Sequence, residues 1–92
     1  MAVVEESVMS LLGTAASVGV ARTFVDARIR KWDYFHILDS ALLVASELVT
    51  NAARQTPHGE IRLQLSRDAY GVIIAVWDAA HELPQAKPMA EL

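Results

Sequence analysis

The stretch IRLQLSRDAYGVIIAVW, residues 61–77, carries the clearest structural signal in the chain. Its first six residues alternate apolar Ile61, Leu63 and Leu65 with polar side chains, a period of two that is typical of a strand with one face in solvent. RDAYG then has the composition of a turn, and VIIAVW is a second, more fully apolar strand. The segment therefore predicts an antiparallel β-hairpin.

Two segments upstream of the hairpin have the periodicity of amphipathic helices. The first, residues 15–32, is expected to begin after Thr14, whose hydroxyl can serve as the N-cap. The second is expected to begin at Asp39 or Ser40 and to end before Pro57 and Gly59. Apolar residues recur at helical spacing at Val18, Ala21, Val25, Ile29 and Trp32, and again at Leu42, Ala45, Leu48, Val49 and Ala52.

The expected order of elements defines the fold class. Residues 7–12 predict a short strand, so the chain reads strand, helix, helix, strand, strand. This order predicts an α+β fold, a two-layer sandwich with two helices packed on one face of a small antiparallel sheet. No internal repeat or boundary is visible, so we expect one domain over residues 1–84. Residues 85–92 have prolines and little periodicity, and we interpret them as a C-terminal tail.

Composition excludes several classes of protein. The chain has 92 residues, of which 53% are hydrophobic, with a net charge of −3 and no dense cluster of Lys or Arg, so we expect no nucleic-acid partner. It contains no cysteine, which excludes disulfides and thiolate metal sites. The uncharged segment 7–21 follows two glutamates rather than basic residues, and it is too short and too polar to span a bilayer. We therefore expect a cytoplasmic protein without a membrane partner.

The second helix carries an unusual pair of polar residues. In SELVTNAARQ, residues 46–55, Glu47 and Asn51 are four positions apart and share one face of an otherwise apolar helix. One interpretation is a solvated polar stripe in which Arg54 is a charge partner. The other is a binding site beside a groove.

These residues also carry a resemblance to a known family. SELVTNAARQ, preceded by ALLVA and followed about twenty residues later by VIIAVWDAAHELP, resembles the first two nucleotide-binding motifs of the GHKL superfamily of gyrase, histidine-kinase and mismatch-repair type ATPases. Within it, the chain is most similar to bacterial anti-sigma-factor serine kinases and related small ATP-binding regulatory proteins. VGVARTFVDARIRKW resembles the first helix of that group, so the similarity covers residues 14–84.

The resemblance implies a function for four residues. It implies a partial ATP-binding fold of the Bergerat type, in which Asn51 coordinates Mg²⁺ between the phosphates of ATP and Glu47 orients or deprotonates an attacking hydroxyl. Arg54 would reach the ribose or a phosphate, although a surface ion pair is the simpler role for it. Asp78 would accept a hydrogen bond from the amine of adenine; the simpler role is to end a strand and cap the next turn.

The sequence also departs from the family pattern. Gln55 stands where many relatives have His, AAHELP stands where glycines follow the Asp in the wider superfamily, and the sequence stops at Leu92 before the lid and the glycine-rich second box. Three amide hydrogen bonds to phosphates, at about 1.5 kcal/mol each, correspond to roughly 10³ in affinity. We therefore expect a truncated domain whose nucleotide site is incomplete in the single chain.

Two functional classes follow from the resemblance. The first is an ATP-binding anti-sigma factor and serine kinase, with a sigma factor or its antagonist as protein partner. The second is a non-catalytic interaction module that retains the scaffold. His36, His58 and His81 have no metal-ligand spacing and are expected to be ordinary surface or half-buried residues.

The hairpin raises a question about assembly. In the family that the chain resembles, the strand that corresponds to the one ending at Asp78 is covered along its edge by further strands. The given sequence does not encode these strands. Residues 72–77 would then form an exposed apolar edge without protecting Lys or Pro, and the tail has a poor strand pattern for covering it. We therefore expect a homodimer that pairs through strand 72–77.

Overall fold

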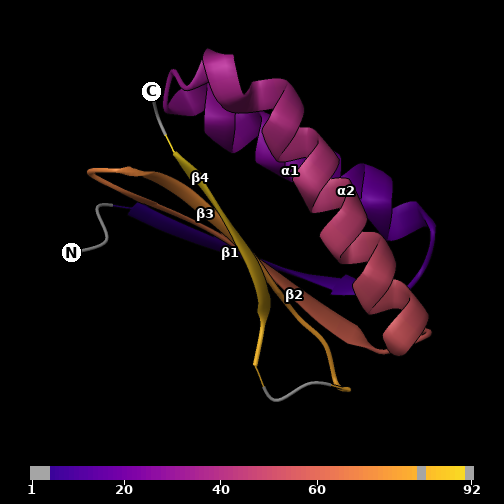
Figure 1. Ribbon diagram of the computed structural model, residues 1–92. Coiled ribbons are helices and arrows are strands. Elements are labelled where there is room, and N and C mark those ends of the chain that lie inside the picture. The colour runs from indigo at the N-terminus through magenta and orange to yellow at the C-terminus, as the bar shows by residue number, and fades with distance from the viewer. Residues whose placement is uncertain (1–4, 81–82, 91–92) are drawn as a thin grey trace.

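A computed structural model describes residues 5–80 and 83–90. Two helices pack on one face of a four-stranded antiparallel sheet, which confirms the α+β two-layer sandwich (Figure 1). Within the described residues no helix is long and apolar enough to cross a membrane.

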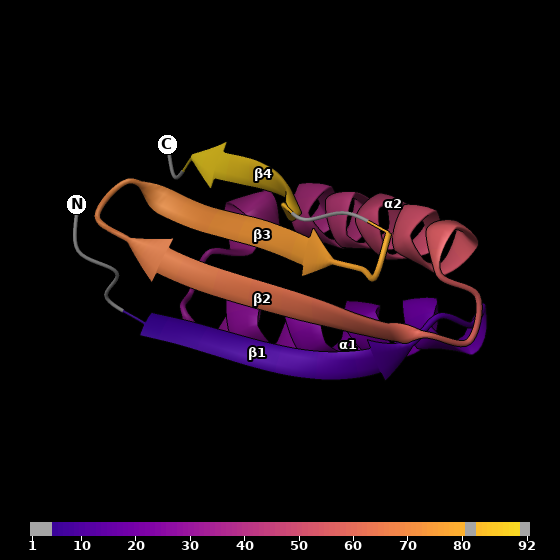
Figure 2. The same ribbon diagram turned by 90° about the horizontal axis from the view of Figure 1, so that it is seen from below.

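The strands form a meander in the order β1-β2-β3-β4, and Figure 2 shows this order across the sheet with both helices behind it. The elements, in chain order, are β1 (Glu5–Leu12), α1 (Ala16–Lys31), the 3₁₀ turn η1 (Phe35–Ile37), α2 (Leu38–Gln55), β2 (Glu60–Asp68), β3 (Gly71–Trp77) and β4 (Gln85–Ala90).

The predicted hairpin is present as β2 and β3. Arg62 pairs with Trp77 and Asp68 with Gly71, so the loop holds two residues, Ala69 and Tyr70. The Asp68 carboxylate oxygen Oδ1 accepts the backbone N–H of Tyr70 at 2.7 Å and that of Gly71 at 3.2 Å. The turn that was expected from composition is therefore fixed by a side chain within it.

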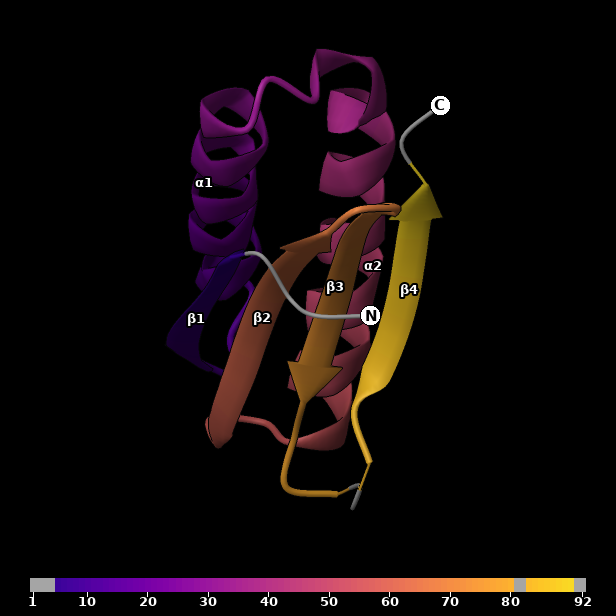
Figure 3. The same ribbon diagram turned by 90° about the vertical axis from the view of Figure 1, so that its left-hand side faces the viewer.

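The core lies between the sheet and the helices. Alternate residues of β2 and β3 face the helices, and small or branched residues of α1 and α2 meet them. The members below 2% exposure are Ala21, Val25, Ile29, Ala41, Ala45, Val49, Ala52, Ile61, Leu63, Leu65, Val72 and Ile74. Because three of the four α2 members are alanines, that helix can lie close to β2, β3 and β4 (Figure 3).

The helix starts differ from the expectation. Thr14 is not the N-cap of α1; that position is Ala15, which has helical dihedral angles and no side-chain cap. The Thr14 hydroxyl lies 3.3 Å from that of Ser17, which donates a hydrogen bond to the carbonyl of Leu12. Neither Asp39 nor Ser40 caps α2, because the preceding 3₁₀ turn continues into the helix. Asp39 lies instead in the first turn, where its negative charge interacts favourably with the positive end of the helix dipole.

The interpretation of residues 85–92 as a tail is wrong where the structure describes them. Gln85–Ala90 forms β4 and pairs antiparallel with β3, placing Met89 opposite Val72 and Lys87 opposite Ile74. Met89 packs against the core from its partly buried position. The domain therefore extends beyond residue 84. Pro88 is compatible with this strand because the outer side of an edge strand makes no hydrogen bonds to a neighbouring strand, so a missing N–H on that side loses none.

The pairing of β4 also overturns the argument for dimerisation through residues 72–77. Strand β3 is paired with β2 on one side and with β4 on the other, so it is an interior strand and has no open edge. The reason given for a homodimer through this strand therefore does not hold.

Candidate functional site

Helix α2 presents the predicted polar residues on its exposed face. Its buried stripe consists of Ala41, Ala45, Val49 and Ala52, which contact the sheet, and Glu47, Asn51 and Arg54 are exposed on other sides of the helix. Residues at positions i, i+4 and i+7 fall on one face, so the spacing alone brings these three side chains together.

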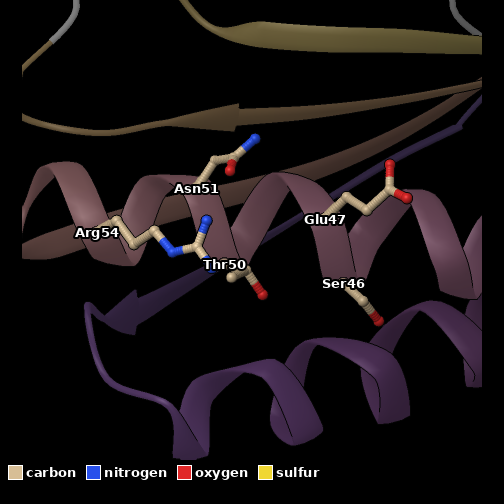
Figure 4. A pocket seen from close by; sticks show the side chains of 5 residues that line it. All are labelled: Ser46, Glu47, Thr50, Asn51 and Arg54. Carbon is tan, nitrogen blue, oxygen red and sulfur yellow. The ribbon is translucent and has the colours of Figure 1, made fainter.

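The exposed face of α2 is hollowed. A cavity of about 420 Å³, open to solvent, is lined by Ser46, Glu47, Thr50, Asn51 and Arg54. Figure 4 shows Glu47 and Asn51 extending from one side of the helix, whereas Ser46 and Thr50 point toward α1. All five residues belong to α2, so one helix forms the lining of this cavity.

The three charged or amide side chains are not tied to one another. Among the described residues, the ion pairs join Asp26 to Arg30 and Glu5 to Lys31 and Arg67, and none involves Glu47 or Arg54. The ion pair with Arg54 that the solvated-stripe interpretation included is therefore not formed, whereas Glu47, Asn51 and Arg54 are all exposed to solvent, as that interpretation expects. Both charges are available to a ligand that reaches the cavity.

Ser46 and Thr50 line the cavity but were not expected there. Ser46 is held by α1, because its hydroxyl accepts a hydrogen bond from Nη1 of Arg22 at 2.7 Å and donates to the carbonyl of Leu42 at 2.8 Å. Thr50 is half-buried. Their spacing of four from one another, one position before Glu47 and Asn51, is the sequence signal that could have identified them.

Arg54 stands between two cavities. A second hollow of about 320 Å³ is lined by Gly13, Ala15, Val18, Thr50, Ala53 and Arg54. It brings the loop between β1 and α1 beside the C-terminal half of α2. The two hollows share Thr50 and Arg54, so an anionic group in either one would lie near the Arg54 guanidinium.

Asp78 is not brought into the α2 cavity. It follows β3 and lines a separate hollow of about 280 Å³ with Glu60, Arg62, Trp77 and Ala79. Its Oδ1 accepts the backbone N–H of Ala80 at 2.8 Å, which is the turn-capping role that was the simpler alternative. Asp78 is half-buried and is not without further partners.

The donor set at the cavity is a sparse one for a metal ion. The described residues contain no group of three or more His, Asp or Glu side chains that could hold a metal. The amide oxygen of Asn51 fits Mg²⁺ as a single protein ligand, because this ion retains water and binds with phosphate oxygens. Such an ion would arrive with a phosphate-bearing ligand rather than reside in the protein.

Comparison with known proteins identifies no relative. No model of a known protein family matches the chain, and neither a curated protein nor a solved structure matches it. The resemblance to the GHKL superfamily therefore stays a prediction from the sequence.

Proposed function

We propose that this protein is a regulatory protein of the anti-sigma-factor-kinase type, with a nucleotide-binding surface on α2. The observation that carries the proposal is the joint position of Glu47, Asn51 and Arg54 along one cavity, without an ion pair among the described residues. A carboxylate can accept the proton of an attacking hydroxyl, an amide oxygen can coordinate a magnesium ion, and a guanidinium can bind a phosphate.

The affinity for nucleotide follows from the shape of the cavity. Because its lining comes from one helix, a bound nucleotide would keep much of its surface in solvent and form few charged hydrogen bonds. We expect Mg-ATP to bind with a dissociation constant on the order of 1 mM, equivalent to about −4 kcal/mol. The protein would then respond to nucleotide only weakly unless a partner covers the cavity.

The test is an NMR titration of the ¹⁵N-labelled protein with Mg-ATP up to about 10 mM, a range suited to this affinity. Amides of residues 47–54 should shift, and Asn51→Ala should weaken binding in the presence of Mg²⁺ more than in its absence. Gln55→Ala is the matched control, since it removes an exposed carboxamide from the same helix that does not line the cavity. If no amide of α2 shifts at about 10 mM Mg-ATP, nucleotide binding is refuted.

Asp78 provides a test of base recognition that depends on the same proposal. Asp78→Asn keeps an Oδ1 that can accept the Ala80 N–H, but it replaces the second carboxylate oxygen by a donor. If Asp78 reads adenine, this variant should lose about 1–3 kcal/mol of ATP affinity, and GTP should bind more weakly than ATP to the wild type. Equal affinities for ATP and GTP would show that Asp78 does not read the base.

Catalysis is the further possibility within this proposal. Glu47 would accept the proton of a serine hydroxyl on the partner while that oxygen attacks the γ-phosphorus of ATP and ADP leaves. Glu47→Gln should then abolish transfer of ³²P to a sigma-factor antagonist and leave ATP binding within about twofold. Transfer that persists in Glu47→Gln would exclude this role.

A second candidate function is that of a non-catalytic interaction module. The exposed side of the helix layer carries Leu43 at 57% exposure and Phe35 at 54%, side chains whose burial a protein partner would favour. Failure of Mg-ATP to bind, together with binding of a sigma factor or its antagonist that Leu43→Ser weakens, would favour this function over the first.

A further inference from the structure

The hollow beside the start of α1 differs in its lining from the α2 cavity. This loop hollow, as we call it, is lined by Gly13, Ala15, Val18, Thr50, Ala53 and Arg54. Four of the six residues are glycine, alanine or valine, and Arg54 is the only one of them with an ionisable side chain. The loop hollow therefore combines a mainly apolar surface with a single positive charge.

The lining of the loop hollow is held in place by contacts within the protein. The N–H of Gly13 donates to the carbonyl of Gly59 at 2.8 Å, and the N–H of His58 donates to the carbonyl of Gly13 at 3.0 Å. Val18 and Ala53 are half-buried and pack against the hydrophobic core. A ligand would therefore find this surface already formed, which lowers the free-energy cost of binding.

The Arg54 guanidinium is available to an anion in the loop hollow. Arg54 is exposed and takes part in none of the ion pairs or side-chain hydrogen bonds among the described residues. In Figure 4 its side chain extends along α2 toward Thr50, which also lines the loop hollow. A guanidinium can bind both oxygens of a carboxylate through parallel hydrogen bonds. Helix α1 begins at the same hollow without an acidic residue in its first turn, so its dipole adds to the positive charge there.

The volume of the loop hollow limits the size of its ligand. It measures about 320 Å³ and is open to solvent. An enclosed apolar cavity of about 150 Å³ is large enough for benzene, so the loop hollow has room for about six to eight carbon atoms. Its single cation matches one negative charge, because a second charge would lie against apolar surface without a partner. A small molecule with one anionic group and a short hydrocarbon chain therefore fits best.

We propose that the loop hollow binds a small aliphatic monocarboxylate with a chain of about five to eight carbon atoms. The hydrocarbon chain lies against Ala15, Val18 and Ala53, and the carboxylate pairs with the Arg54 guanidinium. Removal of the chain from water supplies the affinity, because apolar surface is buried on both the ligand and the protein. The charge pair fixes the orientation of the ligand in the hollow.

The loop hollow and the α2 cavity fit ligands of different chemistry. The α2 cavity contains the carboxylate of Glu47 and the amide of Asn51, and the loop hollow contains neither of these groups. Only Thr50 and Arg54 line both. Binding of a carboxylate in the loop hollow therefore goes beyond the proposed nucleotide binding and does not depend on it.

The first test is an NMR titration of the ¹⁵N-labelled protein with sodium hexanoate, at constant ionic strength and without nucleotide. Amides of residues 13–18 and 50–54 should shift, with a dissociation constant on the order of 10 mM. Each buried CH₂ group contributes about fourfold in affinity, and a half-exposed one about twofold. Butyrate should therefore bind about fourfold to sixteenfold more weakly than hexanoate. The uncharged analogue 1-hexanol should bind at least about threefold more weakly.

The outcomes of this titration are distinct. Equal affinities for butyrate and hexanoate would indicate an adventitious ion only at Arg54 and would overturn the proposal. Hexanol that binds as tightly as hexanoate would overturn the role of the charge. Shifts at residues 47–51 without shifts at residues 13–18 would place the carboxylate in the α2 cavity and also overturn the proposal. Because no nucleotide is present, none of these results decides whether Mg-ATP binds.

The second test changes the charge at the loop hollow. Arg54→Gln should weaken hexanoate binding about threefold to tenfold, whereas Arg62→Gln, at an exposed arginine outside the lining, should leave it within about twofold. Ala15→Asp places a carboxylate in the lining and should weaken binding at least about fivefold. Ala16→Asp is the matched control, because Ala16 is exposed in the same turn and does not line the hollow. Circular dichroism confirms that each variant is folded. Equal hexanoate affinities within either pair would overturn the proposal.

Discussion

At the scale of single residues, Gly13 is a position where two loops approach each other so closely that there is no room for a side chain. Its N–H donates to the carbonyl of Gly59 at 2.8 Å, and its carbonyl accepts the N–H of His58 at 3.0 Å. A Cβ atom at residue 13 would lie 2.1 Å from the carbonyl oxygen of Thr56. This glycine therefore allows the loop after β1 to lie against the loop that ends α2.

We expect Gly13→Ala to lower the free energy of unfolding by about 1–3 kcal/mol, because the added methyl group forces the two loops apart. Gly19→Ala is the matched control. It lies within α1 with nothing within 4 Å of the added Cβ, so the substitution should raise the free energy of unfolding by about 0.5–1 kcal/mol. Urea denaturation of the three proteins measures both effects, and a Gly13→Ala variant as stable as wild type would contradict the close approach.

At the scale of elements, α1 ends in a motif whose left-handed residue is not glycine. The N–H of Tyr34 donates to the carbonyl of Ile29 and that of Asp33 to the carbonyl of Arg30, both at 3.1 Å. This bonding pattern is the Schellman motif, and Asp33 occupies its left-handed position with φ of 59°. Asp33 also places a negative charge at the negative end of the helix dipole.

Replacing Asp33 by Gly should therefore raise the free energy of unfolding by about 0.5–1 kcal/mol, through relief of the left-handed conformation and removal of the charge. Asp33→Asn separates the two causes, because it removes the charge and keeps a residue that tolerates this conformation. Thermal unfolding should rank the stability as Gly above Asn above Asp. A loss of stability in Asp33→Gly would show that the aspartate makes a contact that outweighs its strain.

At the scale of the whole molecule, Glu5 joins three elements. Its carboxylate lies 3.8 Å from Lys31 Nζ of α1 and 3.9 Å from Arg67 Nη2 of β2. The indole N–H of Trp32 lowers the pKa of the Glu5 carboxyl most, and the charges of Lys31, Arg67 and Arg28 lower the pKa further. That indole nitrogen is buried and has no acceptor in good hydrogen-bond geometry, so its effect on Glu5 is that of a nearby dipole.

Stability should therefore depend on the ionisation of Glu5. Because its pKa is lower in the folded protein than the ordinary value of 4.5, the stabilisation is fully present above pH 4.5 and is lost as the pH falls through the folded value. Glu5→Gln should be less stable than wild type at about pH 7, and the difference should disappear at about pH 2. Glu60→Gln, at an exposed glutamate without an ion pair among the described residues, is the control. A difference for Glu5→Gln that persists at low pH would contradict the electrostatic cause.

The sequence by itself determined the elements whose signals are local. The period-two alternation of β2, the turn at RDAYG and the helical spacing of α1 and α2 each depend on residues only a few positions apart, and the structure has these elements within a few residues of their expected bounds. The grouping of Glu47, Asn51 and Arg54 was predictable for the same reason, since helical periodicity places them on one face.

Only the tertiary structure decided how β4 joins the predicted hairpin and that Asp78 lies apart from the α2 cavity. Strand β4 has a weak pattern of its own, and it forms because it pairs with the edge of β3 that β2 leaves open and because Met89 packs against the core. The same pairing makes β3 an interior strand and leaves β1 and β4 as the outer strands among the described residues. The separation of Asp78 from the α2 cavity was equally hidden, because it depends on how the hairpin packs against the helix. These features arise from contacts between distant residues, which local periodicity does not encode.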